Sequence, residues 1–146
     1  MSNEIKLPTK GNVVIIGYAA TGKTTFSNTL KFKGSMYHTD DYIPHGFEQA
    51  LYVLMDDLKK DKVPLKIIEG ILGYRLLRKG LQLQNFYADL VIICQASKEV
   101  RYDRIKARHK DVQATFNLDK VCDKFWSDYT SQLSESLQPK FKIIQS

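Results

Sequence analysis

The feature that most constrains the fold is a glycine-rich octapeptide near the start of the chain, Gly17-Tyr18-Ala19-Ala20-Thr21-Gly22-Lys23-Thr24. Its spacing is G-x-x-x-x-G-K-[ST], the pattern of a phosphate-binding loop, or P-loop. A short β-branched run at 13–16 precedes it and is typical of a buried strand. Phe26 and Leu30 follow it, four residues apart, as expected on one face of a helix. Strand, loop and helix thus come in the order that the motif requires.

The residue types of this motif suit phosphate chemistry. Gly17 and Gly22 allow the backbone to turn tightly and to approach a phosphate without a Cβ atom in the way. The N–H groups of the loop and the positive end of the next helix then point at the anion. Lys23 brings a positive charge to the phosphates, and the Thr24 hydroxyl is a ligand for Mg²⁺. We therefore predict nucleotide contacts from Gly17, Ala19, Ala20, Thr21, Gly22, Lys23, Thr24 and Thr25.

Size and composition indicate an ordinary globular chain. The 146 residues, 43% of them hydrophobic and 26% charged, predict a single domain spanning 1–146. The sequence has no apolar run of about 18 residues and no signal-peptide core at its start, so we expect no membrane contact and a cytoplasmic location. The net charge of +6 fits the binding of polyanions. Because the basic residues are not concentrated in one region, binding of nucleic acid is compatible with the sequence but not indicated. The two cysteines, Cys94 and Cys122, lack metal-ligand spacing and are expected to be buried free thiols.

Hydrophobic periodicity predicts alternating strands and helices along the chain. Pro44 and Gly46 mark the segment 39–46 as a loop, Gly34 is a stop signal for the first helix, and Gly80 is a point where the third helix can break. Alternation of this kind is typical of a three-layer α/β fold with a parallel sheet covered on both faces. The predicted strands are 12–17, 35–38, 65–68, 88–94 and 141–144, and the predicted helices are 24–33, 47–60, 71–83, 97–110 and 116–137.

Carboxylates follow the second and third predicted strands, at the edge of the sheet where open parallel sheets bind ligands. A kinase needs a base near the acceptor hydroxyl, and Asp40 is the first candidate, with Asp41 the second. The alternative is that one of the two caps the following turn. Glu69 can hold Mg²⁺ opposite Thr24, or it can be an exposed residue at a strand end.

Three arginines share one face of the fourth predicted helix, because Arg101, Arg104 and Arg108 are spaced i, i+3 and i+7. Arginines stabilise the charge that spreads over a phosphoryl group in transfer, and a segment that carries them can close over a site. The alternative is a solvated basic face paired with Asp103 and Asp111. Of the three, we favour a catalytic role for Arg104 and Arg108. The aromatic residues of 116–137 are expected to belong to the core.

Several of these stretches together resemble the uridine kinase and related P-loop nucleoside kinases, from about residue 12 to about residue 110. They are 17–25, Asp40-Asp41-Tyr42, the Glu-Gly-Ile-Leu stretch at 69–72, and 88–90 with Arg101 and Arg104. The Asp-Asp-Tyr stretch also resembles the polynucleotide kinase branch of the same superfamily. The resemblance implies strand order 2-3-1-4-5, ATP with Mg²⁺, a hydroxyl acceptor, Asp40 as the base, and a lid at about 101–112 that carries Arg104 and Arg108.

The acceptor pocket does not follow from this resemblance. The chain lacks the insertion with which uridine kinases hold the nucleoside, and Ile43 or Pro44 stands where polynucleotide kinases have an arginine. The residues that can line the pocket are Tyr42, His45, Phe47 and Tyr74, with Asp40 and Asp41 beside them. The favoured function is transfer of the γ-phosphoryl group of ATP to a small hydroxylated acceptor such as a nucleoside or nucleotide. A polynucleotide or modified-base kinase and an ATP-binding module are the alternatives.

Overall fold

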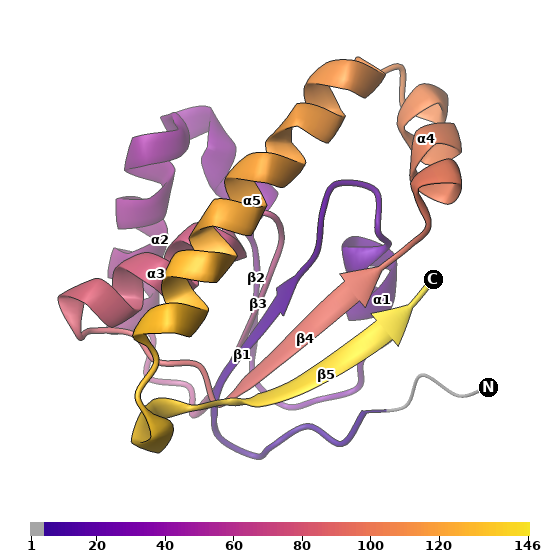
Figure 1. Ribbon diagram of the computed structural model, residues 1–146. Helices are drawn as coiled ribbons and strands as arrows, with labels where there is room; N and C mark the ends of the chain where they lie inside the picture. Colours follow the sequence, from indigo (N-terminus) through magenta and orange to yellow (C-terminus); the bar gives the residue numbers. More distant parts are fainter. Residues whose placement is uncertain (1–4) are drawn as a thin grey trace.

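The structure, a computed structural model, describes residues 5–146 (Figure 1). Residues 1–4, part of the N-terminal segment used above to argue against a signal peptide, lie outside the described residues. The sheet has five strands: β1 (Gly11–Ile16), β2 (Ser35–His38), β3 (Leu65–Glu69), β4 (Leu90–Gln95) and β5 (Lys140–Gln145). Their order is β2-β3-β1-β4-β5, and every neighbouring pair is parallel. The predicted fold class and strand order are therefore confirmed.

Helices cover both faces of this sheet. The α-helices are α1 (Lys23–Asn28), α2 (Phe47–Lys60), α3 (Gly73–Leu83), α4 (Lys98–Ala107) and α5 (Val112–Gln132), with short 3₁₀ segments η1 (Thr39–His45) and η2 (Glu135–Leu137). Figure 1 shows α5 crossing in front of the sheet and α1 behind it. No helix of the described residues is long and apolar enough to cross a bilayer.

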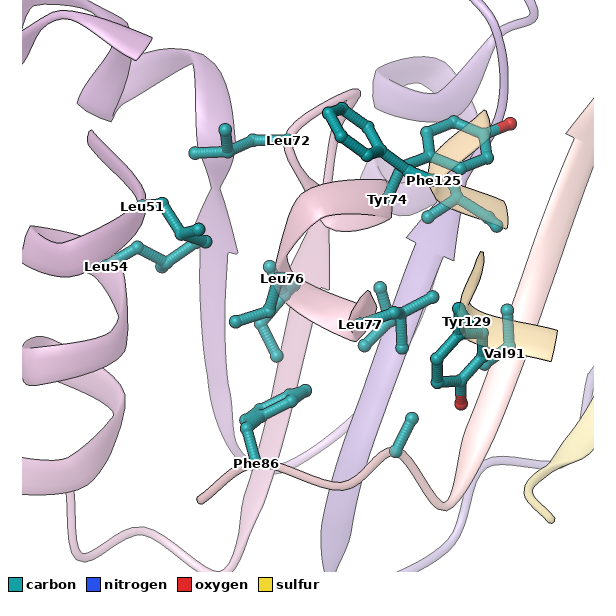
Figure 2. Packing of buried hydrophobic residues seen from close by; sticks show 14 of the residues in the cluster. Leu51, Leu54, Leu72, Tyr74, Leu76, Leu77, Phe86, Val91, Phe125 and Tyr129 are labelled. Atoms are coloured by element: carbon teal, nitrogen blue, oxygen red, sulfur yellow. The ribbon is translucent and has the colours of Figure 1, made fainter. Parts of the chain in front are cut away.

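The central strand β1 separates two hydrophobic clusters. Its side chains alternate between the faces, so Val14 and Ile16 join one cluster while Val13 and Ile15 join the other. The first cluster is the larger and contains residues of α2, α3 and α5. Figure 2 shows Leu54 of α2 and Leu77 of α3 in this cluster. The four β1 side chains are fully buried, which fixes the strand that leads into the P-loop.

The first helix is shorter than predicted, because α1 ends at Asn28 and not near residue 33. After Asn28 the backbone N–H groups of Thr29 and Leu30 bond three residues back, to Phe26 and Ser27. The Thr29 hydroxyl also donates to the Phe26 carbonyl at 2.7 Å, a side-chain bond that competes with the helical ladder. Gly34 is not the stop signal. A Cβ atom there would lie 2.4 Å from the Leu65 carbonyl oxygen, so Gly34 allows the chain to pass close to β3.

The structure decides between two alternatives for the third helix and corrects two further predictions. The third helix does not break at Gly80, where a Cβ atom would lie 2.7 Å from Phe86, so this glycine serves close packing. The predicted loop at 39–46 contains the 3₁₀ segment η1. Helix α5 begins at Val112, four residues earlier than predicted, because the Asp111 side chain caps it by accepting a bond from the Ala114 N–H at 2.9 Å.

Candidate functional site

The loop between β1 and α1 has the backbone strain expected where a chain must wrap around a ligand. Gly22 adopts φ +88° and Ala20, which is not a glycine, adopts φ +63°. A Cβ atom at Gly17 would lie 2.5 Å from the Cys94 carbonyl oxygen on β4. The Thr21 hydroxyl donates to the Tyr18 carbonyl at 2.8 Å and braces the loop from within. Gly17 and Thr21 therefore shape the loop, while Ala19, Ala20, Gly22, Lys23, Thr24 and Thr25 line the adjacent cavity.

Lys23 is held against the loop that it follows. Its Nζ atom donates to the carbonyl oxygens of Gly17 at 2.9 Å and Tyr18 at 2.7 Å. Burial lowers the pKa of this ammonium group, while the nearby charge of Glu69 opposes the shift. The Lys23 side chain therefore lies largely out of solvent beside a cavity, where electrostatic attraction for phosphate oxygens is stronger than in water.

Glu69 is buried at the end of β3 and does not extend into solvent. The Thr24 Oγ1 atom lies 3.4 Å from Glu69 Oε1, so the two predicted metal ligands meet. His38 Nδ1 lies 2.7 Å from the same carboxylate oxygen. The sequence analysis missed this histidine, although its position as the last residue of a predicted strand was a usable signal. In the register of the sheet, His38 is directly opposite Glu69.

Asp40 and the P-loop line one cavity of about 730 Å³, a size typical of small-molecule sites. Asp40 reaches it from η1, Glu69 from β3, and Arg108 from the end of α4. The sheet topology explains this meeting, because the carboxyl ends of parallel strands lie at one edge. The cavity also has an apolar side, formed by Ile43, Phe47, Ile71, Leu72, Leu118, Val121 and Phe125.

The other predicted acceptor residues lie elsewhere. Asp41, the second candidate base, and His45 are exposed and do not line the cavity. The Tyr42 hydroxyl donates to Asp57 of α2 at 2.6 Å, so this side chain ties η1 to α2. Tyr74 is buried and packs edge-on against Trp126, with ring centroids 6.5 Å apart. Of the predicted acceptor-lining residues, Asp40 and Phe47 line the cavity.

Arg101 is a buried structural residue. Its guanidinium group forms two bonds of 2.8 Å with the Asp119 carboxylate on α5, and its Nε–H donates to the Ala19 carbonyl at 2.9 Å. It also lies over the Tyr18 ring, 4.9 Å from the centroid. One side chain thereby joins α4, α5 and the P-loop.

Arg104 lies on α4, and Arg108 follows the last residue of this helix. Arg104 donates to the Ala20 carbonyl of the P-loop at 3.1 Å and to the Ser146 hydroxyl at 2.7 Å. Arg108 lines the cavity. Neither forms an ion pair with Asp103 or Asp111 among the described residues.

Both cysteines are free and buried, as predicted. Burial raises the pKa of the Cys94 thiol to about 11 and that of the Cys122 thiol to about 12. Thiols of this kind are protonated at neutral pH and are poor nucleophiles. Cys122 therefore lines the cavity as an unreactive side chain.

Comparison with solved structures places this geometry in a known fold. The chain resembles a deoxyadenosine kinase from M. mycoides with bound dATP, at a TM-score of 0.55 and 14% identity, over 91% of this chain and 90% of that one. It also resembles a shikimate kinase from Acinetobacter baumannii in complex with shikimate, at a TM-score of 0.59 and 15% identity, over 94% of this chain and 84% of that one. The chain has the fold of the P-loop kinases. No protein-family model and no curated protein matches the sequence, so the finer resemblance to uridine kinases is not confirmed.

Proposed function

We propose that the protein is a kinase that transfers the γ-phosphoryl group of ATP to a hydroxyl of a small molecule, a nucleoside or nucleotide in the first instance. The observation that carries this proposal is the single cavity lined by Lys23, Thr24, Asp40 and Glu69. A P-loop alone would also suit a nucleotide-binding module. A carboxylate facing the same cavity as the P-loop adds the group that a hydroxyl acceptor requires. We expect the enzyme to act in the cytoplasm, where ATP is available.

In the proposed mechanism the chain mainly positions the reactants and neutralises charge. The loop N–H groups and Lys23 bind the phosphate tail, and Asp40 orients the acceptor hydroxyl. The hydroxyl oxygen attacks the γ-phosphorus and its proton passes to the Asp40 carboxylate, while the bond from phosphorus to the β–γ bridging oxygen breaks and ADP leaves. Arg104 and Arg108 stabilise the charge on the transferring group. The segment 101–112 acts as the lid that excludes water.

The residues present also fit Mg²⁺. This ion prefers oxygen ligands and is held by one or two carboxylates together with substrate phosphates and water. Glu69 and Thr24 offer a carboxylate and a hydroxyl oxygen 3.4 Å apart. No cluster of three or more metal-ligating side chains occurs in residues 5–146, so the chain offers no closed cage for a tightly held metal. When bound, Mg²⁺ would neutralise charge on the phosphate oxygens.

The Asp40→Asn variant tests the proposal. Loss of a general base costs about 10²- to 10⁴-fold in turnover, so the variant should bind ATP normally and transfer phosphate very slowly. Asp41→Asn is the matched comparison, since it removes the neighbouring charge outside the cavity, and it should keep most of the turnover. The measurement is phosphorylation of a panel of nucleosides, nucleotides, sugars and oligonucleotide ends. Full turnover by Asp40→Asn would refute the base assignment.

The same panel addresses the two alternatives. A polynucleotide or modified-base kinase should show steep salt dependence of acceptor binding, because contacts to phosphates release counterions. The net charge of +6 favours this alternative mildly. ATP hydrolysis that no acceptor changes would instead favour an ATP-binding module.

A further inference from the structure

Large apolar side chains are exposed on one wall of the catalytic cavity. Phe47 at the start of α2 is 56% exposed, and Leu118 and Val121 on α5 are 42% and 47% exposed. All three line the cavity. Leaving apolar area in water is unfavourable, so a ligand that covers these side chains gains free energy from apolar contact. Their position in one cavity distinguishes them from isolated surface residues.

The wall is continuous with the hydrophobic core. Leu118, Val121 and Phe125 are spaced i, i+3 and i+7 on α5 and so share one face of the helix. At its end toward Phe125 this face is buried, because Phe125 packs in the main cluster (Figure 2). At its other end it opens into the cavity. We call the set Ile43, Phe47, Leu72, Leu118, Val121 and Phe125 the apolar wall.

Arg75 lies beside two residues of this wall, Phe47 and Phe125. Arg75, in the first turn of α3, lines the cavity, donates from Nη1 to the Phe47 carbonyl at 3.2 Å and lies over the Phe125 ring at 5.2 Å. The arginines Arg78 and Arg101, in contrast, form ion pairs with Asp128 and Asp119. Arg75 has no ion pair within residues 5–146. A guanidinium group has five N–H donors, so donors remain for a ligand.

We propose that the phosphoryl acceptor is an alcohol with an apolar, ring-shaped body that covers the apolar wall, and that Arg75 selects it by donating hydrogen bonds to an oxygen on the edge of that ring. This inference rests on the proposed kinase function and deepens it. The hydroxyl lies toward Asp40, and the ring lies between α2 and α5. A compact polyol, which covers little of the wall, is a poor acceptor. The oxygen that Arg75 reads is a ring carbonyl or a carboxylate.

Three ribose compounds test this with ATP and Mg²⁺: D-ribose, uridine and orotidine. They share the sugar hydroxyls, uridine adds a ring with carbonyl groups, and orotidine adds a carboxylate to that ring. We expect kcat/KM for at least one of the two ringed acceptors to exceed that for D-ribose by about tenfold or more, since apolar contacts discriminate by about 10- to 200-fold. The better acceptor of the two shows whether Arg75 donates to a ring carbonyl or to a carboxylate. Equal use of D-ribose would overturn the inference and leave the kinase function standing.

Arg75→Gln and Arg78→Gln form a matched pair, because both residues lie on α3 over the Phe125 ring and only Arg75 lines the cavity. We expect Arg75→Gln to raise KM for the ringed acceptor by about tenfold or more, as for loss of a charged hydrogen bond, with KM for ATP unchanged. Arg78→Gln should leave both constants unchanged. An unchanged acceptor KM in Arg75→Gln would refute its selecting role.

The wall has its own pair of variants. Leu118→Gln should raise KM for the ringed acceptor without loss of thermal stability, because its side chain is already 42% exposed. Leu137→Gln is the control, at 37% exposure and outside the cavity. If no compound is phosphorylated, calorimetric binding of the same three compounds in the presence of ADP separates the two ideas. Binding of a ringed compound but not of ribose supports the wall and counts against the kinase function. Binding of none of the three compounds overturns the inference about the wall, and the wider acceptor panel then decides the kinase function.

Discussion

Replacement of Asp119 by alanine tests whether the contact between α4, α5 and the P-loop holds the site together. The substitution removes the carboxylate that forms both 2.8 Å bonds with Arg101. The Arg101 side chain is 4% exposed, so its charge would remain buried with only the Ala19 carbonyl as an acceptor among its present partners. A buried cation without its counter-charge is strongly destabilising.

The expected magnitude follows from burial. Breaking a buried ion pair by removing one partner costs about 3–5 kcal/mol, and the 19% exposure of Asp119 places this case at the lower end, about 3 kcal/mol. For a protein of this size, 1 kcal/mol shifts Tm by about 2–4 °C, so Tm should fall by about 6–12 °C. ATP affinity should also fall, because Arg101 holds the P-loop through the Ala19 carbonyl.

Urea unfolding gives the free energy of unfolding, thermal unfolding gives Tm, and titration with ATP gives the affinity. Asp128→Ala is the control on the same helix, since its pair with Arg78 is a single 3.2 Å contact at 22% and 35% exposure. A pair of this kind contributes about 0–1 kcal/mol. A loss of less than about 1 kcal/mol in Asp119→Ala, or a loss equal to that in Asp128→Ala, would refute the assigned role.

Two further predictions concern the backbone and the lysine. Gly70→Ala should lower the free energy of unfolding by more than about 3 kcal/mol, because φ is +134° and the new Cβ atom would lie 1.9 Å from Thr39 Oγ1. Gly46→Ala is the control for backbone strain without a clash, because φ is +86° there and no atom lies within 4 Å of the new Cβ atom. If urea unfolding shows the same loss of free energy of unfolding in both variants, the clash at Gly70 is contradicted. Lys23→Met should abolish ATP binding and remove the contribution of Lys23 to the pH dependence of the free energy of unfolding. Burial lowers the pKa of Lys23, so the unfolded chain binds more protons between that pKa and about 10.4, and wild-type stability should rise with pH there relative to the variant. If the difference in the free energy of unfolding between wild type and variant stays constant across that pH range, the lowered pKa of Lys23 is refuted.

The sheet and the P-loop were predictable because their determinants are local. The run at 13–16 is apolar at every position, which indicates a strand buried on both faces, and the glycines beside it allow only a few backbone paths. Asp40 and Glu69 were found by position alone, as polar residues just past a strand. This reasoning works because parallel strands bring their carboxyl ends to one edge.

Roles that depend on distant partners were not predictable from the sequence. Arg101 has the same spacing signal as Arg104, yet a carboxylate 18 residues away and a carbonyl 82 residues away make it structural. The contact of His38 is with Glu69, 31 positions away in a neighbouring strand. Single-sequence periodicity carries no information about such pairs.

Periodicity also cannot separate a core face from a ligand-facing one. Leu118 and Phe125 fall on one apolar face of α5, and the sequence analysis assigned the aromatic residues of this helix to the core. The structure buries Phe125 and exposes Leu118 in the cavity. The same apolar periodicity thus continues from a core position to one that lines the cavity.

The two hydrogen bonds of Lys23 have a consequence for the thermodynamics of nucleotide capture. Because its ammonium group already donates to the Gly17 and Tyr18 carbonyls, most of the rotamer freedom of this long side chain is lost during folding. When a phosphate binds, the Lys23 ammonium group exchanges carbonyl acceptors for phosphate oxygens, and no freely moving side chain has to be immobilised. Preorganisation of this kind reduces the entropic cost of association, so the affinity for the phosphate tail depends mainly on how well its oxygens compete with two backbone carbonyls.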